Sequence, residues 1–445
     1  MFFQQQTEPM PSLPESYRTV RVPENGGFLW KMLAYSGPGY MVAVGYMDPG
    51  NWATDLAGGA KFGYTLLSVI LLSNLMAILL QSLCVRLGVA TGKDLARACR
   101  DYFSPKVNYV LWVLCEIAII ATDLAEVLGS AIALQLLFGL PIIAGVCLTA
   151  FDVLLLLMLQ NRGFRYLEAI IITLIATIGG CFVLELIFSR PDLGQVLAGY
   201  VPTTEIVRNT EMLYIAIGIL GATVMPHNLY LHSAIIQTRA WDDTPKKKRE
   251  AIKFGTIDST IALTLALFIN SAILILSAAT FHFSGNQGVA EIGDAYQLLS
   301  PLLGVSVAST LFAVALLASG QNSTITGILA GQIVMEGFLQ IRLKPWLRRL
   351  ITRLLAIVPA IVTIIIAGEG STTSLLVLSQ VILSMQLSFA VIPLVMFTGS
   401  RKLMGEFVAP LWLKSIAWAV AIVIAGLNLW LLLQTFIGQF EQTGH

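Results

Sequence analysis

The chain has 445 residues, of which 56% are hydrophobic and only 12% are charged. Soluble domains are about one quarter charged, so this composition excludes an ordinary soluble protein and predicts an all-α protein that crosses the membrane many times. The net charge of +1 gives no reason to expect nucleic acid as a partner.

Residues 1–30 precede the first apolar stretch. Up to about Gly27 they are polar and rich in proline, without the basic start, apolar core and cleavage site of a signal peptide. We therefore expect a disordered cytoplasmic tail here.

A single transmembrane domain is expected over residues 31–437, followed by an extracellular tail at 438–445. Apolar stretches long enough to cross a bilayer recur throughout this domain. The eleven expected spans cover about 33–60, 64–90, 107–137, 140–160, 164–188, 211–238, 252–281, 303–337, 346–367, 372–398 and 411–436.

Lysine and arginine are distributed unevenly between the two ends of these spans. If the N-terminus is cytoplasmic, 24 of the 27 basic residues fall in cytoplasmic segments, and only Lys61, Arg190 and Arg208 fall outside. This is the asymmetry of the positive-inside rule. It predicts a multi-pass protein of the cell membrane with an extracellular C-terminus.

Two similar motifs interrupt the first and the sixth span. Asp48-Pro49-Gly50-Asn51 and Met225-Pro226-His227-Asn228 share the form X-Pro-X-Asn. Proline breaks a helix, and non-helical backbone inside a membrane is tolerated only where it is buried or lines a cavity. Spans 1–5 (about 33–188) and 6–10 (about 211–398) would run in opposite directions. We therefore expect two inverted five-helix repeats plus an eleventh helix, with the substrate site at the two breaks.

The first break contains Asp48 and Asn51. An ionised group midway along an apolar span is costly and indicates function, and Asn51 can face the same cavity. These oxygens suit a cation. The alternative is that Asp48 only caps the second half of the helix, and the two roles are compatible.

The second break adds a sulfur atom. Pro226 frees carbonyl groups upstream, including those of Ala222 and Thr223, which can coordinate a cation. The thioether of Met225 suits transition metals and is a poor ligand for Mg²⁺ and Ca²⁺. Alternatively, Met225 fills the core, as methionine usually does in an apolar helix.

Other polar residues offer proton carriers or supporting ligands. His227 and His232 titrate near neutral pH, although each could instead be a hydrogen-bonded packing residue. Gln81 and Gln380 lie in apolar surroundings, where they could bond unwound backbone or only join helices.

The third span carries Glu116, Asp123 and Glu126. The last two share one helix face. Carboxyl groups inside a membrane must be protonated, paired or hydrated. They indicate either a proton path away from the metal site or a structural ion pair with Arg353 of the ninth span, and both can hold together.

The two motifs, with Thr54-Asp55 after the first and Leu229-Tyr230-Leu231-His232 completing the second, resemble the signatures of the NRAMP family of divalent metal transporters. The resemblance implies a LeuT-like fold in which Asp48, Asn51, Met225 and the Ala222 carbonyl bind Mn²⁺ or Fe²⁺, with Gln380 joining in some conformations. It also implies that His232, Asp123, Glu126, Glu116 and Arg353 serve proton movement and gating. His227 and Gln81 are added to this second group as candidates from their position.

The predicted function is import of Mn²⁺ and similar metals, coupled to protons, by alternating access. The alternative is a sodium-coupled symporter of an organic solute on the same fold, which Asp48 disfavours because it would repel a substrate carboxylate. We expect no cofactor and no obligate protein partner. No HExxH, GxSxG or nucleotide-binding loop indicates an enzyme, and a channel would not need broken helices around one site.

Overall fold

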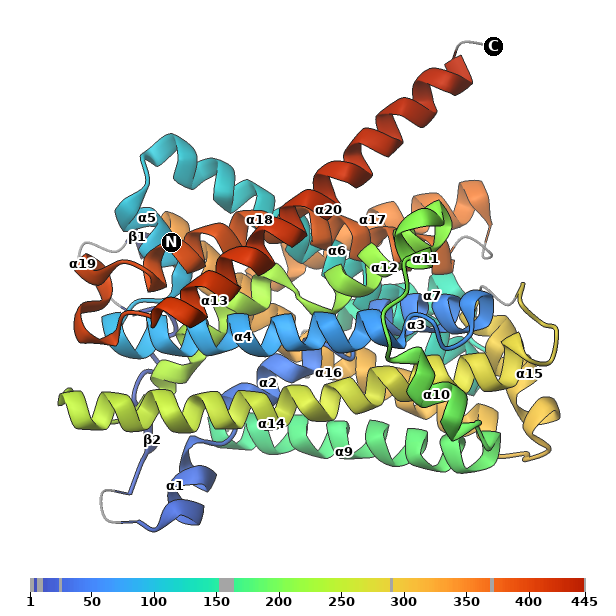
Figure 1. Ribbon diagram of the computed structural model, residues 1–445, viewed down its shortest axis with the longest axis horizontal. Coiled ribbons are helices and arrows are strands. Elements are labelled where there is room, and N and C mark those ends of the chain that lie inside the picture. Colours follow the sequence, from blue (N-terminus) through green and yellow to red (C-terminus); the bar gives the residue numbers. More distant parts are fainter. Residues whose placement is uncertain are drawn as a thin grey trace.

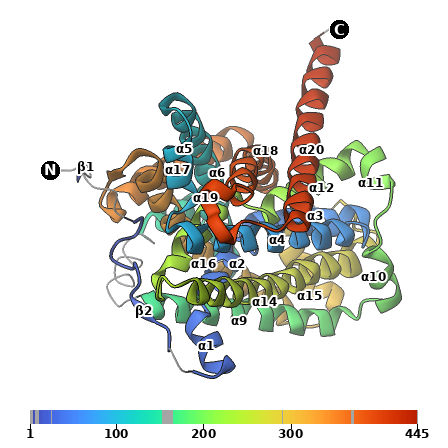
Figure 2. The ribbon, with the colours of Figure 1, turned by 60° about the vertical axis from the view of Figure 1, so that its left-hand side comes forward.

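The computed structural model describes residues 4–5, 11–23, 26–151, 164–288, 291–368 and 372–443. The described chain is a bundle of long helices, with α20 leaving the bundle at an angle (Figures 1 and 2). Eight of the described helical segments are long and apolar enough to cross a membrane. Many large apolar side chains on their outer surface are exposed, as expected of surface that faces lipid.

The first half of the chain is helical apart from two short strands. The strands are β1 (Gln4–Gln5) and β2 (Val20–Arg21). The helices are α1 (Phe28–Tyr35), α2 (Pro38–Gly45), α3 (Pro49–Phe62), α4 (Leu67–Thr91), α5 (Leu95–Tyr102), α6 (Pro105–Phe138), α7 (Ile142–Leu148) with the 3-10 turn η1 (Thr149–Phe151), α9 (Phe164–Ser189), α10 (Leu193–Gly199) and α11 (Glu205–Arg208).

The second half begins with the other broken span. Its strands are β3 (Arg239–Ala240) and β4 (Ile341–Arg342). Its helices are α12 (Thr210–Thr223), α13 (Pro226–Ile235), η2 (Ile236–Thr238), α14 (Pro245–Ser277) with the π turn η3 (Ala278–His282), α15 (Ile292–Leu303), α16 (Ala308–Leu339), α17 (Pro345–Ala367), α18 (Thr372–Thr398), α19 (Arg401–Met404), η5 (Gly405–Phe407) and α20 (Leu411–Thr443).

Two expected boundaries need comment. Within the fourth expected span the structure describes α7 and η1, while residues 152–160 of that span lie outside the described residues. The last helix was expected to end near 436 but α20 continues to Thr443. Residues 437–443 contain no proline, and glutamine and glutamate favour helix, so nothing local ends it.

The N-terminal segment was expected to be disordered, and this is wrong for residues 11–23. Ser12 Oγ donates a 2.8 Å hydrogen bond to Asp94 Oδ2, and β2 pairs in parallel with β3. Arg18 forms a 2.8 Å ion pair with Asp243, which holds the pKa of the Asp243 carboxyl below its usual range. The polar residues of this segment, whose composition indicated disorder, instead contact the acidic side chains Asp94 and Asp243.

The centre of the bundle is formed where the broken helices meet their neighbours. α3 packs against α6, α12, α14 and α18, while α16 lies along both α6 and α9. The fully buried ring of Trp52 in α3 lies between Phe182 and Phe312, with ring centroids 4.8 and 5.2 Å away. These contacts hold the first turns of α3 in the middle of the protein.

Candidate metal centre

The first break separates α2 from α3 at Tyr46–Asp48. Asp48 has an extended backbone and caps α3, because its Oδ1 accepts a 2.8 Å hydrogen bond from the backbone N–H of Asn51. Pro49 occupies the first helical position, where its missing N–H costs nothing. The capping role considered from the sequence is therefore present, and it uses only one of the two carboxylate oxygens.

The second break separates α12 from α13. α12 ends at Thr223, and Met225 has an extended backbone before Pro226 starts α13. In a continuous helix the Ala222 carbonyl would accept a hydrogen bond from the N–H of residue 226. Because that residue is proline, the carbonyl lacks its helical donor.

Asn51 joins the two breaks. Its side-chain Nδ2 lies 3.1 Å from the Ala222 carbonyl oxygen and 2.8 Å from Asp48 Oδ1. Asn270 of α14 supports this arrangement by donating to the Tyr46 carbonyl at 2.7 Å and lying 3.4 Å from Asn51 Oδ1. Asp48, Asn51 and Ala222 therefore meet directly, on a scaffold that includes Asn270.

Met225 and Gln380 also lie against the first break, where they pack on Gly45 and Gly50. A Cβ atom built on Gly45 would lie 3.1 Å from the Met225 sulfur, and one on Gly50 would lie 1.7 Å from Gln380 Nε2. The absence of a side chain at these positions lets both groups approach the first break closely. All five candidate ligands from the sequence thus border the two breaks.

The site is buried, and two of its side-chain oxygen atoms lack hydrogen-bond partners among the described residues. Asp48, Met225 and Gln380 have no solvent exposure. Within the described part of the chain, neither Asp48 Oδ2 nor Gln380 Oε1 has a hydrogen-bond partner. A buried carboxylate oxygen without a partner is costly, and a cation would compensate it. No cluster of three His, Cys, Asp or Glu residues suited to a metal occurs among the described residues, so this site offers one carboxylate with neutral ligands.

An acidic pair on α6 faces an arginine of α17. Arg353 Nη1 lies 2.9 Å from Asp123 Oδ1 and 3.7 Å from Glu126 Oε2, and all three side chains are buried. Ser323 and Thr324 of α16 donate hydrogen bonds to Glu126 at 2.9 and 3.1 Å. The ion pair considered from the sequence is present. We call the group formed by Asp123, Glu126, Ser323, Thr324 and Arg353 the polar column.

Glu116 belongs to a separate ion pair on the same two helices. It lies 3.0 Å from Arg348, one and a half turns before Arg353, and accepts a hydrogen bond from Trp112 Nε1. Arg348 was not singled out from the sequence, although it lies in the same basic run as Arg353.

The polar column approaches the candidate metal centre at Gly129. A Cβ on this residue, three positions after Glu126, would lie 2.1 Å from Pro49 Cβ. Three residues is nearly one helical turn, so Glu126 lies just beyond the contact between α6 and the first break. This close contact between α6 and the first break links the two groups of candidate residues.

The histidines are placed differently. His232 Nδ1 lies 2.9 Å from Gln81 Oε1, and Gln81 Nε2 donates to the Tyr46 hydroxyl at 2.9 Å. This chain of side chains leads to the first break through Tyr46. His227 is buried directly after Pro226, and its Nδ1 has no partner among the described residues.

Comparison with known proteins identifies the family. Residues 39–434 match the family Nramp, natural resistance-associated macrophage protein-like. The chain belongs to the Nramp family. It is 75% identical over 435 residues to the divalent metal cation transporter MntH of Nostoc sp., covering 98% of both chains. To the protein of the same name from Listeria monocytogenes it is 63% identical over 425 residues, covering 96% of this chain and 95% of the other.

Solved structures of two transporters share the architecture. The manganese transporter of Eremococcus coleocola, crystallised with an aromatic bis-isothiourea substituted compound, superimposes with a TM-score of 0.88 at 44% identity, covering 94% of this chain and 90% of that one. MHP1, a nucleobase-cation-symport-1 family transporter, superimposes with a TM-score of 0.55 at 14% identity over 89% of this chain and 92% of the other. That second likeness concerns the fold alone. The all-helical, LeuT-like fold expected from the sequence is confirmed.

Proposed function

We propose that this Nramp protein transports divalent transition metal ions, Mn²⁺ and also Fe²⁺, across the cell membrane. It is a transporter and not an enzyme. The observation that carries the proposal is the unpartnered, buried Oδ2 of Asp48 at the point where two broken helices meet. A manganese transporter and a divalent metal cation transporter among the similar proteins support the same reading.

The metal is held by the groups around the two breaks. Asp48 supplies the negative charge, Asn51 and Ala222 supply neutral oxygens, and Met225 supplies a sulfur ligand. Gln380 adds its amide oxygen from α18 in some conformations. Sulfur favours soft transition metals over Mg²⁺ and Ca²⁺, which prefer oxygen alone. Selection by ligand type therefore resides mainly in Met225.

Protons move through the polar column of α6, α16 and α17. Asp123 and Glu126, which lie 2.9 and 3.7 Å from Arg353, exchange the protons. Glu116 with Arg348 extends the column along α6. His232 with Gln81, and His227, are gating or proton-carrying candidates beside the breaks. The proton gradient thus drives metal import.

Alternating access uses the breaks as hinges. The second half of each broken span begins at a proline that follows an extended residue, Asp48 before α3 and Met225 before α13. Because no helical hydrogen bonds cross these points, α2 and α13 can tilt without breaking hydrogen bonds inside α3 and α12. The described conformation is closed around the site, because Asp48 and Met225 have no exposure. Opening on one side or the other then requires movement of a half-helix and its neighbours.

The membrane arrangement follows from charge. One eleven-span domain over residues 31–437, made of two inverted repeats and a final helix, places its basic loops in the cytoplasm. The N-terminus is then cytoplasmic and the C-terminus extracellular.

Transport into liposomes tests the proposal. Purified protein is reconstituted with a pH dye inside, and Mn²⁺ is added outside, with and without excess Mg²⁺ or Ca²⁺. Mn²⁺ entry with acidification of the lumen, resistant to both competitors, is expected. A sodium-dependent uptake of an organic solute, without Mn²⁺ entry, would instead establish the alternative symporter.

A further inference from the structure

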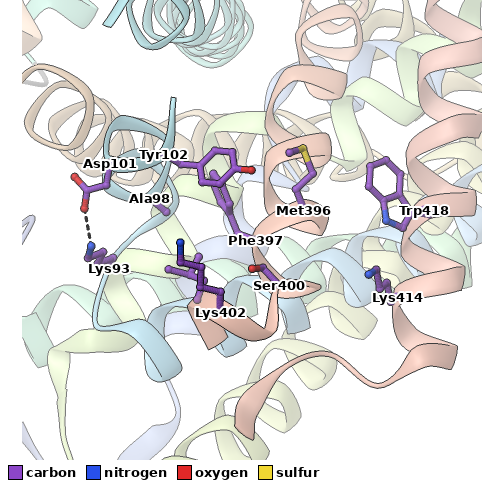
Figure 3. A pocket seen from close by; sticks show the side chains of 11 residues that line it. Lys93, Ala98, Asp101, Tyr102, Met396, Phe397, Ser400, Lys402, Lys414 and Trp418 are labelled. Carbon is purple, nitrogen blue, oxygen red and sulfur yellow. Dashed lines mark hydrogen bonds and ion pairs between the residues drawn. The ribbon is translucent and has the colours of Figure 1, made fainter. Parts of the chain in front are cut away.

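A second cavity lies at the basic end of the bundle, away from the metal centre. It has a volume of about 490 Å³ and is bounded by α5, the end of α18, α19 and the start of α20 (Figure 3). Its walls combine lysine side chains with apolar and aromatic ones. Nothing in the transport mechanism uses these residues.

The cavity carries an excess of positive charge. Lys93 forms a 2.6 Å ion pair with Asp101, which leaves Lys402 and Lys414 without an acidic partner in the part of the chain that the structure describes. The formal charge of the lining is therefore +2. The stem of Lys414 passes close to Gly399, where a Cβ atom would lie 2.9 Å from its Cε. Two cations with no counter-charge suit a phosphate group.

The remaining wall is apolar. Met396 and Phe397 from α18 and Trp418 from α20 line the cavity, as Figure 3 shows. The ring of Tyr102 meets Phe397 edge-on, with centroids 5.3 Å apart, and is itself 65% exposed. Such a surface suits hydrocarbon, and an exposed tyrosine is typical of the boundary between lipid and water.

The start of α20 places the cavity at the membrane surface. Leu411 and Trp412 are 82% and 64% exposed, as expected of apolar side chains that face lipid. The basic residues of this end face the adjacent headgroups, as the positive-inside distribution requires. A ligand in the cavity can therefore have its polar end among headgroups and its apolar end in the bilayer.

We propose that this cavity binds an anionic phospholipid. The phosphate lies between Lys402 and Lys414, near the Ser400 hydroxyl, which is not used to cap α19. An acyl chain lies along Met396 and Trp418. Basic pockets between helices at the cytoplasmic side are the usual sites for anionic lipid headgroups. The bound lipid would join α18, which carries Gln380, to α5 and α20.

Free phosphate shares the headgroup chemistry but leaves the apolar wall unused. A phospholipid covers Met396 and Trp418 as well as the lysines. The two sources are therefore separable by comparing phosphatidylglycerol, phosphatidylcholine and inorganic phosphate as probes.

The full-length protein is purified in detergent, and binding of phosphatidylglycerol is measured by native mass spectrometry together with its effect on the melting temperature. The variants are the double variant Lys402→Gln/Lys414→Gln, the cavity-filling variant Met396→Trp, and Arg401→Gln as a control that removes a neighbouring charge outside the lining. Loss of two lysines at about 1 kcal/mol each predicts about a 30-fold weaker affinity for phosphatidylglycerol.

The wild type and Arg401→Gln should retain phosphatidylglycerol in native mass spectrometry. Phosphatidylglycerol should also raise the melting temperature of both proteins, whereas phosphatidylcholine should not. Met396→Trp should weaken retention although its charge is unchanged. Equal retention by the double lysine variant and the wild type would overturn the proposal. So would an equal gain in melting temperature from inorganic phosphate, which would show that only the anion is recognised. These measurements do not involve metal, so their failure leaves the transport proposal untouched.

Discussion

The side-chain amide of Asn51 lies 3.1 Å from the carbonyl oxygen of Ala222, although 171 residues separate the two along the chain. This hydrogen bond joins the break of the first span to the break of the sixth. It exists because Pro226 deprives the Ala222 carbonyl of its helical donor, while Asp48 caps α3 and orients Asn51. The same local effects that end the helices therefore assemble the site.

The substitution Asp48→Asn removes the charge of Asp48 but keeps its shape, and therefore tests its role as a metal ligand. Asparagine is as good a helix cap as aspartate, so Asp48→Asn should leave the melting temperature nearly unchanged. Loss of the only carboxylate at the breaks should lower Mn²⁺ uptake at limiting metal at least about tenfold, since one lost charged ligand costs more than about 1.4 kcal/mol. Asp192→Asn, which alters the exposed cap of α10, is the matched control for uptake into liposomes.

Met225 is predicted to act as the selectivity element. Met225→Ala should keep part of the Mn²⁺ transport and admit Ca²⁺ or Mg²⁺ better, because the remaining ligands are all oxygens. The control is Met212→Ala, which removes a different buried methionine that lies in α12. Each substitution should lower the free energy of unfolding by about 2–5 kcal/mol. Inhibition of Mn²⁺ uptake by Ca²⁺ distinguishes the two variants, because only Met225→Ala should become more sensitive to Ca²⁺. Unchanged selectivity in Met225→Ala would show that sulfur is not the filter.

Asp123 should matter more for protons than for metal. Asp123→Asn leaves the buried Arg353 with a weaker partner, and breaking a buried ion pair typically costs about 3–5 kcal/mol. The double variant Asp123→Asn/Arg353→Gln removes both charges, so it should regain stability but not proton movement. Proton and Mn²⁺ fluxes are measured together in liposomes. Recovery of proton flux in the double variant would assign the pair a purely structural role.

The contact between Gly129 and Pro49 should be required for a working site. Gly129→Val would force α6 away from the first break, and overpacking of this kind typically costs about 1–3 kcal/mol. Gly180→Val is the control, because a Cβ on that α9 glycine meets no atom within 4 Å. Melting temperature and Mn²⁺ uptake should both fall in the first variant only. Equal effects of the two would contradict the proposed link between the polar column and the site.

The fold could be anticipated because its causes are local. The lengths of the apolar stretches, the prolines at 49 and 226, and the uneven distribution of basic residues each act through the backbone or the membrane. The order of residues 11–23 could not be anticipated, because it depends on distant partners. Ser12 meets Asp94, and β2 pairs with β3, only after the helices have packed.

The same distinction applies to the site. Asp48 and Met225 could be singled out as candidate ligands because a carboxylate or a sulfur atom beside a proline in an apolar span is unusual. Asn270 was not, since one amide in the long α14 has no local signal, and its bond to the Tyr46 carbonyl depends on helix packing. Arg348 was missed because its pairing with Glu116 depends on how α17 lies along α6.

The most direct test of the central claim is a crystal structure with Mn²⁺, located by its anomalous scattering. We predict a peak between the two breaks, within coordination distance of Asp48 Oδ2 and the Met225 sulfur, that is lost in Asp48→Asn. A peak away from both breaks, or one that persists unchanged in the variant, would contradict the assignment of the metal centre.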